Sequence, residues 1–102
     1  MISDNLIFPD WPAPETIKAL STKRRGGFSL PPYDDFNLGT HVGDEPNTVI
    51  KNRGYLVDIA QLPESPRWLN QIHGTRVINS NDWQLNMDAD AIISQQNNHI
   101  CT

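Results

Sequence analysis

The chain has 102 residues, of which 37% are hydrophobic and 20% are charged, and its formal net charge at pH 7 is −4. This composition is typical of an ordinary globular domain, or of part of a larger one. Basic residues are scattered, and the run Lys23-Arg24-Arg25 is too short to attract a polyanion by itself. The charge pattern therefore argues against a nucleic-acid partner.

The cysteine count and the hydropathy pattern bear on the compartment. Cys101 is the single cysteine, so an internal disulfide is excluded and nothing indicates an oxidising environment. The first residues lack the basic and apolar regions of a signal peptide. No apolar run approaches the roughly 18 residues of a membrane span. We expect a cytoplasmic protein without a membrane partner.

Eight prolines and six glycines break the chain into short segments, which favours several strands and loops. Residues 17–22 alternate in polarity and predict a strand. Arg25-Gly26-Gly27 predicts a turn or a bulge. Residues 30–34 contain two prolines, which donate no hydrogen bond to a sheet, so this segment predicts a loop.

The clearest predicted helix follows Asp44 and ends near Ala60. Asp44 is a good N-cap residue, and Pro46 falls in the first turn, where its missing N–H costs little. Apolar residues recur at helical spacing, so we expect Val49 and Leu56 to be buried against a sheet.

The rest of the chain predicts extended segments at 67–72, 77–78, 88–94 and 99–101. The first of them breaks at His73-Gly74, and Asn97-Asn98 predicts a turn before the last. The strand that begins at His99 is not finished, so the sheet is expected to be incomplete and its edge near Ile100 to Thr102 exposed.

Histidine is a common metal ligand and titrates near neutrality, which makes the three histidines the first candidates for chemistry. His73 precedes Gly74, which allows a sharp turn and the close approach of a ligand. The position suits a metal ligand or a catalytic base, but it also suits a surface histidine at a strand end. His41 fits a plain loop residue, and His99 is expected to be exposed.

Other polar residues leave two interpretations open. Asp88 and Asp90 alternate around Ala89, so they either bind a metal or a shared proton, or line a solvated strand edge. Asn37 either holds a loop by an Asx-type bond or contacts a ligand. Cys101 is expected to be an inert, buried strand residue. No complete zinc motif and no phosphate-binding glycine loop is present.

Several motifs together resemble the YfiH/laccase-domain (DUF152) family. Its opening pattern is matched in order by Ser21-Thr22, Arg24, Gly26-Gly27, Ser29, Tyr33, Asn37-Leu38-Gly39, His41, Gly43-Asp44 and Asn52-Arg53. Two later motifs are matched by Trp68-Leu69-Asn70-Gln71-Ile72-His73-Gly74-Thr75 and by Asp88-Ala89-Asp90-Ala91. An extra residue near Lys23 leaves Arg24 and Arg25 both open as the family's arginine.

The resemblance implies an α+β fold of mixed β-sheets flanked by helices, of which residues 1–102 are the amino-terminal portion of a single YfiH-like domain. It implies a metal site of two histidines and a cysteine, in which His73 is the first histidine. The Thr-Ala-Asp-Cys and His-Ala-Gly-Trp-Arg-Gly segments that carry the other ligands do not occur in the chain, and Cys101 is not the family's cysteine.

By the same resemblance, the intact enzyme is expected to act on purine nucleosides. The implied reactions are phosphorolysis of adenosine and inosine and deamination of adenosine, with His73 as the catalytic and metal-binding residue. Zinc suits such a site best and copper is possible. Asn37 and Arg24 are candidate substrate contacts, Arg24 for the phosphate. Two alternatives remain, a copper-dependent polyphenol oxidase and a non-catalytic structural or binding fragment.

Overall fold

The computed structural model describes residues 6–102. Its elements are β1 (Leu6–Ile7), β2 (Ser21–Thr22), α1 (Pro46–Ala60), β3 (Val77–Asn79), a 3-10 helix (Ser80–Asp82) and β4 (Ala91–Ile93). One helix with two small sheets confirms the predicted α+β class. Within residues 6–102, no helix combines the length and the apolar character needed to cross a membrane.

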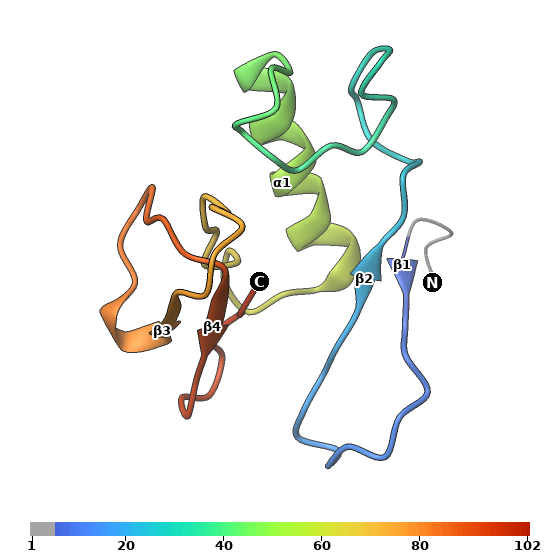
Figure 1. Ribbon diagram of the computed structural model, residues 1–102. Coiled ribbons are helices and arrows are strands. Elements are labelled where there is room, and N and C mark those ends of the chain that lie inside the picture. Colours follow the sequence, from blue (N-terminus) through green and yellow to red (C-terminus); the bar gives the residue numbers. More distant parts are fainter. Residues whose placement is uncertain (1–5) are drawn as a thin grey trace.

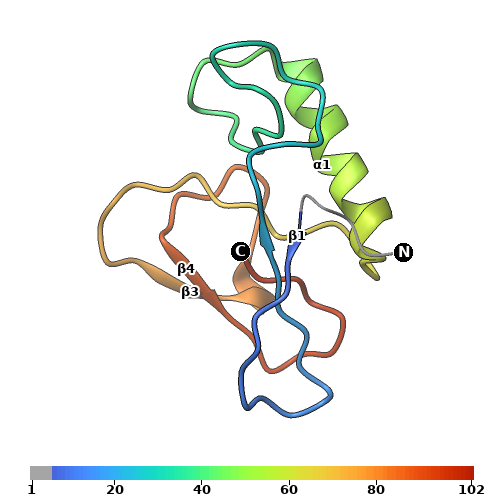
Figure 2. The same ribbon diagram turned by 90° about the vertical axis from the view of Figure 1, so that its right-hand side faces the viewer.

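The two sheets differ in strand direction and lie apart from one another (Figures 1 and 2). β1 and β2 are antiparallel, and β3 and β4 are parallel. Two of the predicted strands are shorter than expected, because 17–22 contributes only its last two residues and 88–94 only Ala91–Ile93. The predicted turn at 25–27, loop at 30–34 and turn at 97–98 are confirmed.

The segment 67–72 was expected to be a strand, and this prediction is wrong. It pairs with its neighbours only through two isolated bridges, from Arg67 to Cys101 and from Asn70 to Asp88. The physical reason lies two residues beyond Asn70. The N–H of Ile72 donates to the Asp90 carboxylate at 3.2 Å, so a side chain takes the place of the backbone partner that a ladder requires.

The helix begins one residue later than the sequence indicates, because Glu45 and not Asp44 is its N-cap. The Glu45 carboxylate accepts a hydrogen bond from Thr48 N at 2.9 Å, and Pro46 occupies the first turn as predicted. Asp44 is unable to cap because its carboxylate accepts hydrogen bonds from Ser29, Asn37 and the N–H of Glu45.

The predicted buried face of α1 is confirmed, since Val49 is 0% and Leu56 is 4% exposed. Leu56 packs with Leu6 of β1 and with Phe36, and these three side chains form the hydrophobic core cluster. The carboxyl end of α1 accordingly lies close to β1 and β2 in Figure 1. The remaining fully buried side chain of the helix is polar, Asn52, which the apolar pattern did not predict.

Candidate functional site

Asn52 is the centre of a buried hydrogen-bond network that attaches the segment 28–44 to α1. Its Nδ2 donates to Ser29 Oγ at 2.9 Å and to the carbonyl oxygen of Asn37 at 2.7 Å. Its Oδ1 accepts from Phe28 N at 2.8 Å. All polar atoms of this amide are therefore satisfied, which is the condition for burying it. The network fixes the position of Asn37.

The side chain of Asn37, a predicted substrate contact, makes hydrogen bonds to residues close to it in sequence. Its Oδ1 accepts from Gly39 N at 3.0 Å, and its Nδ2 donates to Gly39 O and to the Asp44 carboxylate. This is the Asx-type turn that was one of the two interpretations from sequence. An amide oxygen has two lone pairs, so one acceptor position on Oδ1 remains for a ligand.

Arg24 and Asn37 line the same shallow cavity, which has a volume of about 230 Å³. The Arg24 guanidinium is already engaged there. Its Nε donates to Asp34 O at 2.8 Å, and its Nη2 lies 3.8 Å from the Asp34 carboxylate. Arg25 reaches the same carboxylate at 3.2 Å but does not line the cavity. Geometry thus favours Arg24 over Arg25 as the arginine beside Asn37.

His73 lies at the tip of a turn, with a left-handed backbone (φ 58°) and an exposed side chain. The Asp90 carboxylate holds this turn from both sides of the histidine. One oxygen accepts from Ile72 N at 3.2 Å and the other from Gly74 N at 3.0 Å. Hydrogen bonds from backbone N–H groups to a carboxylate are among the stronger kinds. Asp90 therefore positions the turn, a role that neither sequence interpretation of the Asp88/Asp90 pair included.

The structure does not unite the three predicted site residues in one cavity. Arg24 and Asn37 line the shallow cavity, and His73 is not among its lining residues. In residues 6–102, no group of three or more histidine, cysteine, aspartate or glutamate side chains is placed to hold a metal ion. A catalytic zinc site requires about three protein ligands. Of the ligand set that the resemblance implies, residues 6–102 contain only His73, so by themselves they do not fit a complete metal centre.

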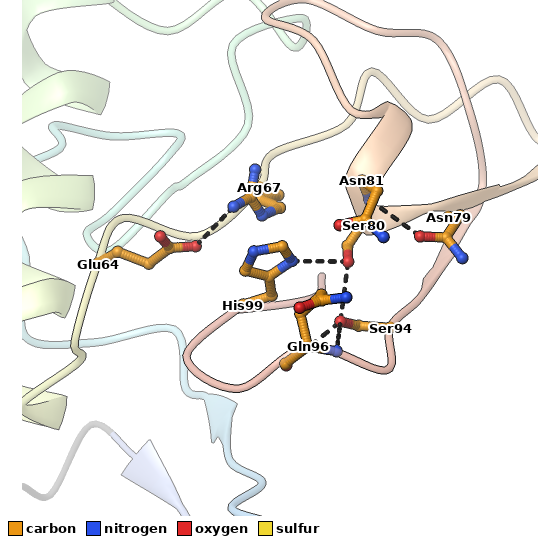
Figure 3. Close-up of polar contacts among 8 residues, drawn as sticks. All are labelled: Glu64, Arg67, Asn79, Ser80, Asn81, Ser94, Gln96 and His99. Atoms are coloured by element: carbon orange, nitrogen blue, oxygen red, sulfur yellow. Dashed lines mark hydrogen bonds and ion pairs between the residues drawn. The ribbon is translucent and has the colours of Figure 1, made fainter.

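The third histidine belongs to a different cluster (Figure 3). His99 Nδ1 lies 2.8 Å from Ser80 Oγ, which is also 2.8 Å from Ser94 Oγ. His99 is half-buried, so the expectation that it is exposed is wrong. Ser80 is only 1% exposed, so its hydroxyl is not accessible to a substrate. The cluster ties the segment after β4 to the segment after β3.

Cys101 is exposed, so the prediction that it is buried is also wrong. The atoms packed near its sulfur still raise the pKa of the Cys101 thiol, and the charge of Arg67 opposes this shift. A raised pKa reduces the thiolate fraction at neutral pH and with it the reactivity of the thiol. Arg67 also makes an ion pair of 3.2 Å with Glu64, drawn in Figure 3.

The network around Asn37 makes the stability of the fold dependent on pH through Asp44. The hydrogen bond from Ser29 lowers the pKa of Asp44 below its ordinary value of 3.8, with smaller contributions from Asn37 and the Glu45 N–H, and burial opposes the shift. A carboxyl group with a lowered folded-state pKa stabilises the fold above its ordinary pKa. This contribution is lost as the pH falls through the folded value.

We therefore expect Asp44→Asn to be less stable than the wild type at pH 7, with the difference shrinking as the pH falls from about 5 to about 2. Urea unfolding across this range measures both curves. The control is Asp58→Asn, an exposed position on α1 whose side chain makes no hydrogen bond in residues 6–102. A constant difference between Asp44→Asn and the wild type at all pH values would contradict this assignment.

Both a family model and individual proteins match this chain. A family model described as multi-copper polyphenol oxidoreductase laccase matches residues 18–102. A purine nucleoside phosphorylase of Haemophilus influenzae is 45% identical over 95 residues, which are 93% of this chain and 39% of that relative. The purine nucleoside phosphorylase YfiH of Escherichia coli is 51% identical over 73 residues, 72% of this chain and 30% of that relative.

The fold has a solved counterpart. The crystal structure of a Neisseria meningitidis protein assigned to DUF152 matches with a TM-score of 0.82 and 42% identity, over 91% of this chain and 38% of that one. The described residues thus have the α+β fold of DUF152. The chain belongs to the multi-copper polyphenol oxidoreductase laccase family and spans between 30% and 39% of the length of these relatives.

Proposed function

We propose that this chain forms the amino-terminal part of a metal-dependent purine nucleoside enzyme. The proposed reactions are the phosphorolysis of adenosine and inosine and the deamination of adenosine. The observation that carries the proposal is the turn at His73, which Asp90 holds by two hydrogen bonds and which leaves the imidazole accessible. Relatives at 45% and 51% identity that are named purine nucleoside phosphorylases support it.

In this proposal His73 is both a metal ligand and a catalytic residue, and ligands from outside this chain complete the site. Zinc is the metal we expect, because a neutral imidazole combined with other nitrogen and sulfur ligands suits zinc. Arg24 and Asn37 contact the substrate from the shallow cavity that they share. The family description favours one second candidate, a copper-dependent polyphenol oxidase. Metal analysis of the purified enzyme distinguishes zinc from copper.

For the 102-residue chain alone, we propose weak metal binding and no turnover. One imidazole competes poorly with water for a metal ion, since tight sites combine several ligands. We also propose that the chain self-associates through the backbone near Ile100 to Thr102, where Cys101 and Thr102 are exposed. Measuring bound zinc and the molecular mass in solution tests both statements on the same sample.

The decisive experiment joins this chain to the remaining part of the Haemophilus influenzae relative, which is 45% identical over the matched residues. The chimera, the 102-residue chain and the unaltered relative are each assayed with adenosine and phosphate. We expect adenine and ribose 1-phosphate, or inosine and ammonia, from the chimera and from the relative, and no product from the chain alone. A chimera that folds and binds metal but converts no nucleoside would refute the proposal.

A further inference from the structure

One cavity in the described residues is lined by a cation that has no carboxylate partner. This cavity, of about 380 Å³, lies between α1 and the segments 65–70 and 83–86. Its size falls within the roughly 300–1,000 Å³ typical of small-molecule sites. Arg53 is the one charged residue in its lining, which otherwise consists of apolar, hydroxyl and amide side chains. The lining contains no carboxylate, although the chain carries a net charge of −4.

The Arg53 guanidinium is held in place but only partly satisfied. Its Nε donates to Leu38 O at 2.8 Å, and its Cζ lies 4.2 Å from the ring centroid of Trp68. These two contacts fix the plane of the guanidinium. Among residues 6–102, Arg53 makes no ion pair, and neither Nη has a hydrogen-bond partner. The free edge is the one that binds phosphate or carboxylate in a bidentate manner.

Partial burial of Arg53 favours the binding of an anion. Removal from water lowers the pKa of Arg53, which means that its charged form is destabilised in the fold. A negatively charged ligand would offset this cost. Thr40, Ser65 and Asn70 also line the cavity and offer uncharged hydrogen-bonding groups beside the guanidinium. Asn70, which lines the cavity, lies three residues before His73, so this part of the lining is close in sequence to the candidate metal-binding turn.

Arg24, the arginine first considered for the phosphate, has the opposite surroundings. It is exposed, and its ion pair with Asp34 places a carboxylate in the lining of its own cavity. An incoming anion would be repelled by that carboxylate and would have to displace it. A surface ion pair is also well hydrated, so little is gained by exchanging one anion for another.

We propose that Arg53 is the residue that binds the phosphate, in the cavity lined by Trp68 and Trp83. The identification of the anion as phosphate rests on the proposed function, whereas the anion site itself rests on the unpaired guanidinium. Arg24 then contacts a part of the substrate that carries no negative charge. Trp68 and Trp83 lie in the lining, so their fluorescence reports whether the cavity is filled.

The test is a titration of the 102-residue chain with inorganic phosphate at constant ionic strength, followed by tryptophan fluorescence. We expect saturable binding in the wild type and a loss of about tenfold or more in affinity for Arg53→Gln. Arg53→Lys keeps the charge without the bidentate edge, so its loss should be smaller. Arg24→Gln should lose less affinity than either, and Arg25→Gln, an exposed arginine outside both cavities, should bind as the wild type does.

A measurement without mutation covers the case in which Arg53 variants fail to fold. Phenylglyoxal modifies accessible arginines, and peptide mapping then shows which of them phosphate protects. Protection of Arg53 with no protection of Arg24 supports the proposal. Protection of Arg24 instead, unchanged affinity in a folded Arg53→Gln, or no saturable binding in the wild type would overturn it. None of these results depends on nucleoside turnover, so an inactive chimera would refute the proposed function while leaving the anion site in place.

Discussion

Replacing His73 with alanine in the chimera is expected to abolish nucleoside turnover and to lower the zinc content of the purified protein. Loss of a partner that merely orients a metal ligand costs about 10–100-fold in affinity or activity. Loss of the ligand itself should exceed that range, so we expect a decrease in kcat/KM of more than about 100-fold. Zinc per chain, measured by mass spectrometry, should fall in parallel.

Two further variants give this prediction a graded control. Asp90→Asn keeps the size of the side chain but replaces the carboxylate that accepts hydrogen bonds from Ile72 N and Gly74 N with a neutral amide. Its loss of kcat/KM should fall within the range of about 10–100-fold. His41 is an exposed loop histidine that makes no side-chain hydrogen bond in residues 6–102, and His41→Ala should behave as the wild type does. Equal losses in His73→Ala and His41→Ala would show that His73 has no special role.

The helix shows how far local patterns predict this fold. Its extent and its buried face follow from Pro46 and from the spacing of Val49 and Leu56, which are properties of neighbouring residues. Its cap does not follow. Asp44 is a better cap residue than Glu45, yet Ser29 and Asn37 occupy the Asp44 carboxylate. These partners are 15 and 7 residues away in sequence, so no local pattern contains them.

The candidate site was predictable to a similar degree. The glycine after His73 indicated a turn, and the structure has one, whereas the carboxylate that holds it comes from Asp90, 16 residues beyond Gly74. The alternation at 88–90 marked two carboxylates on one face without indicating that one of them accepts from backbone N–H groups. Arg53 was visible from sequence only as part of a motif, because its lack of a carboxylate partner is a property of the folded chain.

Gly27→Ala is expected to lower the free energy of unfolding by about 3 kcal/mol, at the upper end of what overpacking costs. A Cβ at this position would lie 2.5 Å from Asp35 O, 2.7 Å from Asn52 Oδ1 and 2.7 Å from Phe36 Cδ1. Asp35 O accepts from Ser29 N, Asn52 is fully buried, and Phe36 belongs to the core cluster, so none of these atoms has room to move. The clash therefore affects the network that positions Asn37.

Gly54→Ala is the matched control, because a Cβ there meets no atom within 4 Å. Gly54 lies inside α1, where alanine is favoured over glycine by about 0.5–1 kcal/mol. The same chemical change should thus stabilise the chain at position 54 and strongly destabilise it at position 27. Urea unfolding of both variants beside the wild type measures the two effects. If Gly27→Ala were as stable as the wild type, the close packing of segment 24–36 against Asn52 would be wrong, and with it the placement of Arg24 beside Asn37.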